Sequence, residues 1–181
     1  MRMSEMTQSF VLHFGEMGNR WGFNRTVGQI LGLLIVNEEM LNAENISEAL
    51  SISRGNVSMG LKELQSWRLV KPVHVQGDRK EYYMPMADIW TLALTVMEER
   101  RKREVDPTLT VLRSALLEEP SSSKDEYAQL RIKELHDLLE QATTWSNEFQ
   151  NMSPENLERL VKLGTGVGKV LDIKDKLLNK S

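Results

Sequence analysis

The sequence predicts a mainly α-helical fold that contains one small β-hairpin. Apolar residues recur every three or four positions through most of the 181-residue chain, which is the spacing of amphipathic helices. Between residues 69 and 86, β-branched and aromatic residues instead flank Gln76-Gly77-Asp78-Arg79, a pattern typical of two strands joined by a tight turn. Pro72 has no backbone N–H to donate, so we expect its strand to lie at an edge.

Helices are expected on both sides of the hairpin. Before it, they are predicted at residues 3–20, 26–40, 43–50 and 54–67. The first carries apolar residues at helical spacing, namely Met6, Phe10, Phe14, Met17 and Trp21. After the hairpin, Asp88 is a candidate helix cap, and Asp106-Pro107 restarts or kinks that helix. Ser123 and Glu126 form a predicted capping box for a long helix to about Asn151, and Ser153-Pro154 opens a last helix interrupted by glycines 164, 166 and 168.

Composition excludes several classes of protein. The chain is 40% hydrophobic and 27% charged, as in ordinary soluble globules. Its longest apolar stretch, from Ile30 to Val36, is too short to span a bilayer, and no export signal is visible. The absence of cysteine excludes disulfides, a thiol nucleophile and cysteine-based metal sites. We therefore expect a cytoplasmic protein.

The segment from Ala43 to Met86 is the most informative part of the sequence. Ile46, Ala49 and Leu50 would form the inner face of a short helix, and Ala49 is small enough to let a second helix cross closely. Ile52 would plug the turn, and Ser53 would cap the next helix. That helix would turn its apolar residues inward, namely Val57, Leu61 and Leu64.

The opposite face of this second helix is polar and basic. Short polar and basic side chains are the types that contact phosphates and read base edges in the major groove. A basic hairpin tip beside such a helix can enter the minor groove or grip the backbone, and Asp78 is expected to brace Arg79. The DNA-binding residues predicted on the helix and the hairpin are Ser53, Arg54, Gly55, Asn56, Ser58, Met59, Lys62, Asp78, Arg79 and Lys80.

Local charge agrees with this interpretation. The whole chain has a net charge of −3, but residues 51–83 contain six basic and three acidic residues. The order of elements predicts a winged helix-turn-helix with a two-stranded wing, with additional N- and C-terminal helices forming a dimerisation scaffold. Its parts would be an N-terminal helix at 1–25, the winged domain at 26–87 and a helical dimerisation or regulatory region at 88–181. The plainer interpretation is a solvated αα-hairpin packed on a β-hairpin.

The run from Asn45 to Leu64, which reads NISEALSISRGNVSMGLKEL, resembles the MarR superfamily of bacterial and archaeal regulators, and specifically its GbsR-type branch. Further matches are Gly22-Phe23-Asn24-Arg25, Trp67-Arg68-Leu69-Val70 and the hairpin run from Gly77 to Tyr83. The resemblance covers about residues 10–107. It implies a homodimeric transcriptional regulator, a repressor by expectation, that binds a pseudo-palindromic operator on double-stranded DNA. Some relatives sense choline or betaine-type osmolytes. The alternative is a winged-helix protein–protein adaptor without DNA binding.

Other chemistry is weakly represented. His13, His74 and His136 lie on different predicted elements and in no metal-ligand spacing. The run from Gly164 to Lys169 departs from a phosphate-binding loop in spacing and in the residue after the lysine. Glu98 with Lys102, and Glu99 with Arg103, are expected to pair on a solvated helix face. We therefore expect no enzyme activity, no cofactor and no metal.

Two sets of apolar residues remain to be assigned. The first has helical or heptad spacing and predicts dimerisation, with an intramolecular core as the alternative; it comprises Phe10, Phe14, Met17, Leu135, Leu138, Ala142, Trp145 and Phe149. The second could supply ring faces for a cationic effector, because aromatic rings attract quaternary ammonium groups, although such residues usually pack in cores; it comprises Trp21, Phe23, Trp67, Tyr82, Tyr83 and Trp90.

Overall fold

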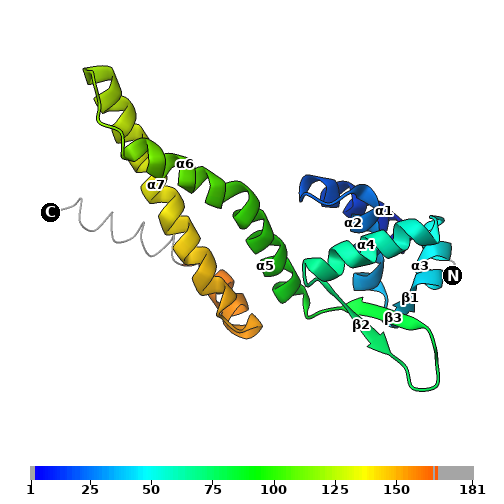
Figure 1. The fold of residues 1–181 in the computed structure, drawn as a ribbon. Helices are drawn as coiled ribbons and strands as arrows, with labels where there is room; N and C mark the ends of the chain where they lie inside the picture. The colour runs from blue at the N-terminus through cyan, green and yellow to red at the C-terminus, as the bar shows by residue number, and fades with distance from the viewer. Residues whose placement is uncertain (1–2, 165, 167–181) are drawn as a thin grey trace. The chain divides into compact units, whose positions relative to one another are not determined.

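The computed structural model describes residues 3–164 and 166 (Figure 1). Its elements are, in order, α1 (Glu5–Arg20), α2 (Arg25–Val36), β1 (Leu41–Asn42), α3 (Ala43–Leu50), α4 (Arg54–Ser66), β2 (Val70–His74), β3 (Glu81–Pro85), α5 (Ile89–Arg100), the π-helix η1 (Arg101–Val105), α6 (Asp106–Leu116) and α7 (Ser123–Gln150). Residues 154–164 are also helical. The mainly helical winged fold predicted from the sequence is confirmed.

The chain divides into two compact units between Ser114 and Ala115. The first unit contains the helix-turn-helix, the sheet, α1 and α5. The second unit contains α7 and the helical residues 154–164. Of the last predicted helix, residues 165 and 167–181 lie outside the described residues, and Gly168 with them.

The sheet has three antiparallel strands in the order β1-β3-β2, one more than the predicted hairpin. β1 is only two residues long and pairs Leu41 with Tyr83. Such a short strand has no alternation that a sequence pattern can detect. β2 lies at the edge and carries Pro72, as predicted.

The helices α1 and α2 cross at very short distance through glycines. A Cβ atom on Gly28 would lie 2.8 Å from the carbonyl oxygen of Phe14 and 3.0 Å from the Cα of Gly15. The side of α1 that is fully buried therefore carries Val11, Gly15 and Gly18. The predicted apolar face is only partly buried, and Met6 is 80% exposed, because backbone-to-backbone packing favours the small residues.

The core of the helix-turn-helix agrees with the sequence prediction. Ile46 of α3 and Val57, Leu61 and Leu64 of α4 are all buried, and Ile52 packs partly buried against the same core. α4 also lies close to α2, since a Cβ on Gly60 would sit 2.6 Å from the Cδ1 of Ile30. The outer face of α4 is consequently the one left to solvent.

Side-chain caps set the helix ends, mostly as expected. The Ser53 hydroxyl accepts the Asn56 N–H at 3.2 Å, and Asp88 caps α5. Asn42 and Asn45 form a reciprocal capping box at the start of α3. The predicted capping box at Ser123 is wrong, because the hydroxyl of Ser122 caps α7 by accepting the N–H of Asp125.

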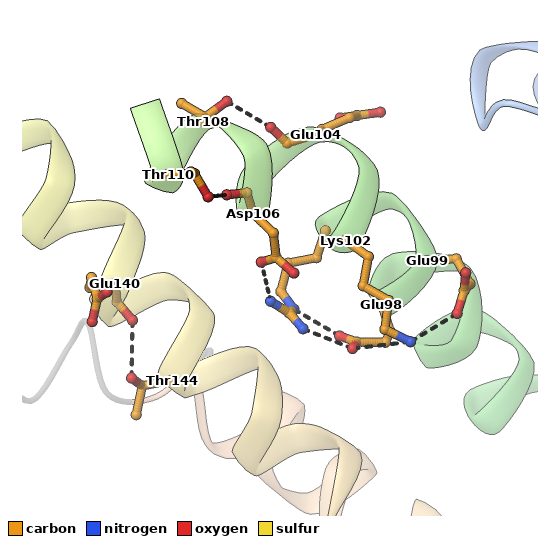
Figure 2. Close-up of polar contacts among 10 residues, drawn as sticks. Glu98, Glu99, Lys102, Glu104, Asp106, Thr108, Thr110, Glu140 and Thr144 are labelled. Carbon is orange, nitrogen blue, oxygen red and sulfur yellow. Dashed lines mark hydrogen bonds and ion pairs between the residues drawn. The ribbon is translucent and has the colours of Figure 1, made fainter. Parts of the chain in front are cut away.

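One π-helical turn, η1, joins α5 to α6 where Asp106-Pro107 predicted a restart. Figure 2 shows the ion pairs around it. The Arg101 guanidinium binds both Glu98 and Asp106, and the hydrogen bonds that it donates to the Glu98 carboxylate raise the pKa of Arg101. Lys102 lies 3.6 Å from Glu98, which confirms that predicted pair, and 3.0 Å from Glu99. The predicted pair of Glu99 with Arg103 is wrong.

Arg103 instead reaches back to the winged domain. Its guanidinium carbon lies 4.0 Å from the ring centroid of Trp67, the residue that ends α4. Trp67 packs in turn on Phe23, with their ring centroids 4.1 Å apart. A cation–π contact of this kind contributes about 0.5–2 kcal/mol. It holds η1 against the end of α4.

Candidate nucleic-acid interface

The outer face of α4 presents the predicted polar and basic residues to solvent. Its exposed residues are Arg54, Gly55, Asn56, Ser58, Met59 and Lys62. The turn before α4 is tight, because Ser51 adopts a left-handed conformation with φ of 54°. Ser53 uses its hydroxyl as the helix cap. This geometry directs the first two turns of α4 outward.

The β2–β3 hairpin places a free cation at its tip. Arg79 is exposed and makes no ion pair or side-chain hydrogen bond within residues 3–164. Asp78 does not brace it, contrary to the prediction. The Asp78 carboxylate accepts the Lys80 backbone N–H at 2.9 Å and the Tyr82 hydroxyl at 2.8 Å, and these bonds lower the pKa of Asp78. Asp78 therefore stabilises the turn and leaves Arg79 available.

A third group, Glu44 of α3, was not predicted. Its carboxylate binds the guanidinium of Arg54 and lies 3.1 Å from the Nζ of Lys80. The hydrogen bond from Lys80, followed by the charge of Arg54, lowers the pKa of Glu44. Glu44 therefore connects the starts of α3 and α4 with the hairpin. In the sequence it is only an acidic residue in the first turn of a helix, which is common for dipole reasons.

The structure does not gather the six predicted effector-binding aromatics into one cage. Phe23 and Trp67 pack together as described, and Trp67 already holds a cation. Trp21 contacts Phe14 edge to face at 5.1 Å instead, and Trp90 is exposed. The two tyrosines hydrogen-bond to different carboxylates, Tyr82 to Asp78 and Tyr83 to Glu81. Burial, followed by the bond to Glu81, raises the pKa of Tyr83 to about 12.

An apolar cavity of about 330 Å³ lies between α1, α2 and α5 in the first unit. Its lining includes Phe14, Trp21, Leu31, Ile35, Val96 and Met97. Arg100 also contributes to the lining, and its guanidinium binds both carboxylate oxygens of Glu104 at 3.0 Å. Trp21 is the one residue of the predicted aromatic set that lines this cavity.

The residues predicted for dimerisation differ in exposure. On α1, Phe10, Phe14 and Met17 are partly buried, with the two phenylalanine rings stacked at 5.1 Å. On α7, Leu135, Leu138, Ala142 and Trp145 are exposed, Leu138 to 61% and Trp145 to 56%. Phe149 is partly buried and contacts Trp145 edge to face. The α7 set forms an exposed apolar seam.

Within residues 3–164, no group of three or more His, Asp or Glu side chains is arranged to hold a metal ion. None of the helices described is long and apolar enough to cross a membrane.

Comparison with known proteins identifies relatives for most of this chain. Residues 21–81 match the model of the MarR family. The HTH-type transcriptional regulator YvaV of Bacillus subtilis is 23% identical over 84% of this chain and 90% of its own length. The HTH-type transcriptional repressor GbsR of the same organism is 27% identical, but the match spans about half of each protein, 52% in both cases. A crystal structure of a transcriptional regulator shares the fold, with a TM-score of 0.58 and 22% identity over 87% of this chain and 99% of that one.

Proposed function

We propose that this chain is a transcriptional regulator of the MarR family, that it binds double-stranded DNA as a homodimer and that it acts as a repressor. α4 would enter the major groove as the recognition helix, and the β2–β3 hairpin would contact the backbone or the minor groove as the wing. The observation that supports this most directly is the outer face of α4, whose polar and basic residues are all exposed, as is Arg79 at the tip of the hairpin. The family comprises regulators and not enzymes.

The wing is tested first. Arg79→Ala should weaken binding to all sequences and reduce the slope of log K against log salt by about one, because one phosphate-binding or minor-groove cation is lost. The measurement is a salt titration of binding to a duplex from the chain's own upstream region. Arg20→Ala is the matched control, since Arg20 is exposed at the end of α1, outside the interface. Unchanged affinity and slope in Arg79→Ala would show that the wing assignment is wrong.

The recognition helix is tested by sequence preference. Asn56 and Ser58 are short, exposed and in the first two turns of α4, where base-reading residues of such helices lie. Replacing either with alanine should change which duplexes are preferred and leave the salt slope nearly unchanged. Selection of bound duplexes from a randomised pool measures this. A protein–protein adaptor would instead select no sequence at all.

The proposed homodimer makes a prediction about the operator. A dimer places two recognition helices in successive major grooves, so the operator should be a pseudo-palindrome with half-sites about 10 bp apart or a multiple of that. The exposed α7 seam of Leu135, Leu138, Ala142 and Trp145 supports the idea of a second copy covering this face. A chain that sediments as a monomer at micromolar concentration, with and without operator, would contradict the model.

For the effector, we propose a small osmolyte such as choline or glycine betaine in the cavity between α1, α2 and α5. The cavity offers the ring faces of Phe14 and Trp21, which attract a quaternary ammonium group. It also offers Arg100, which would bind a ligand carboxylate in exchange for the carboxylate of Glu104 that its guanidinium holds in the free protein. Glycine betaine carries both groups, so we expect it to bind more tightly than choline.

Calorimetric titration of both osmolytes into the free protein and into the operator complex tests the effector. Trp21→Ala should abolish the heat of binding, whereas Trp90→Ala, outside the cavity, should keep it. An effector alters operator affinity only if it favours one dimer arrangement over another. No heat and no change of operator affinity at millimolar osmolyte would rule out this class of ligand.

A further inference from the structure

We propose that Glu44 acts as an internal counter-anion of the DNA-binding surface formed by α4 and the wing. It holds Arg54 and Lys80 until DNA phosphates displace it, and it thereby sets the salt dependence and the strength of binding to the DNA backbone. This inference rests on the DNA-binding function proposed above. Glu44 would be a regulating residue of the interface and not a DNA contact. It lies on α3, while the two cations lie on α4 and at the wing.

The geometry brings three separate elements to one carboxylate. One oxygen of Glu44 accepts from the Arg54 guanidinium, and the other lies 3.1 Å from the Lys80 Nζ. Each cation has its own oxygen, so both are engaged at once. The side chains remain accessible, with Arg54 73% and Lys80 55% exposed. A phosphate oxygen therefore meets these cations at the surface and has to compete with Glu44 for them.

The negative charge of Glu44 weakens the attraction of this cluster for DNA. Arg54 and Lys80 together offer two positive charges to DNA, but Glu44 beside them leaves a net charge of one. The carboxylate also repels approaching phosphates, which carry the same sign of charge. Glu44 is ionised at neutral pH, as an exposed glutamate ordinarily is, and the hydrogen bond from Lys80 lowers its pKa further. By contrast, Arg79 has no such partner within the described residues and remains fully available to DNA.

The alternative role for Glu44 is to position the two cations for DNA. If Glu44 positions the two cations, its removal should weaken DNA binding, because Arg54 and Lys80 would lose their orientation. A counter-anion would make binding stronger when removed. The two roles therefore predict opposite signs for the same substitution, and the exposure of both cations favours the counter-anion.

Glu44→Gln in the full chain is the test, measured on a mixed-sequence duplex across a salt series. We expect the slope of log K against log salt to become steeper by about one, and affinity near 0.1 M salt to rise about three- to tenfold. Glu63→Gln is the matched control, because it removes the same charge from α4 without removing an ion pair among the described residues. Circular dichroism should show the same fold in both variants.

A second background separates competition for the two cations from a general charge effect. In a chain that already carries Arg54→Ala and Lys80→Ala, Glu44→Gln should change affinity no more than Glu63→Gln does. Weaker binding by Glu44→Gln, or an effect equal to that of Glu63→Gln in the parent chain, overturns the inference. If the parent binds DNA and Arg79→Ala weakens it, such a result leaves the proposed function standing. If the parent binds no duplex at all, the proposed function itself fails.

Discussion

The helices α4 and α7 differ in the burial of their apolar side chains. α4 has 13 residues and buries Val57, Leu61 and Leu64 against its own unit, leaving polar and basic residues outside. α7 has 28 residues, none of them buried, and exposes large apolar side chains such as Leu138 and Trp145. Burial of apolar surface is the main source of stability. The stability of α4 therefore comes from burial within its own unit, whereas α7 buries no side chain among the described residues.

The largest expected effect is on α4. Leu61→Ala removes a buried side chain and should lower the free energy of unfolding by about 2–5 kcal/mol. Leu138→Ala on α7 makes the same chemical change at an exposed position and should cost less than about 0.5 kcal/mol in dilute solution. Urea unfolding at low protein concentration measures both. Equal losses would show that α7 is also stabilised within one chain.

The next effect tests the seam of α7 directly. Trp145→Glu should weaken association by about 2 kcal/mol or more, roughly thirtyfold in dissociation constant, because it places a charge in an apolar interface. Tyr127→Glu is the control on the same helix, at an exposed position off the seam. Sedimentation over a concentration series distinguishes them. If both variants associate like the parent, the seam is not the interface.

A smaller effect is expected where α1 crosses α2. Gly28→Ala brings a Cβ within 3 Å of backbone atoms of α1 and should lower stability by about 1–3 kcal/mol. Gly55→Ala on the outer face of α4 meets only an ordinary contact with the Ser53 side chain. That control should be neutral or slightly stabilising, since alanine favours helix. Thermal unfolding of the two variants measures the difference, and a loss in Gly55→Ala as large as in Gly28→Ala would argue against a close-packing role.

The smallest effect is expected at the turn between α3 and α4. Ser51 has a left-handed backbone, which glycine adopts without steric cost, so Ser51→Gly should raise stability by up to about 1 kcal/mol. Ser58→Gly lies in the exposed middle of α4 and should instead lower stability by about 0.5 kcal/mol. Chemical denaturation of both variants checks the signs. A loss in Ser51→Gly would mean that the serine side chain has a role of its own.

Much of the fold and part of the site could be predicted from local signals. Turn residues, helix caps and apolar spacing act within a few positions of the chain. They indicated α3, α4 and the hairpin almost to the residue, the Ser53 cap and the edge position of Pro72. The same local logic failed at Ser123, because the neighbouring Ser122 offers the same hydroxyl and caps α7.

By itself, the sequence determined the winged helix-turn-helix fold of this chain, because the pattern from Asn45 to Tyr83 combines inward apolar residues with an outward polar and basic face. Only the tertiary structure decided which groups meet across elements. It brought Glu44 to Arg54 and Lys80, and Arg103 to Trp67. Lys80 is 36 residues away from Glu44, and contacts at such a separation depend on the packing of whole helices, which no local spacing encodes.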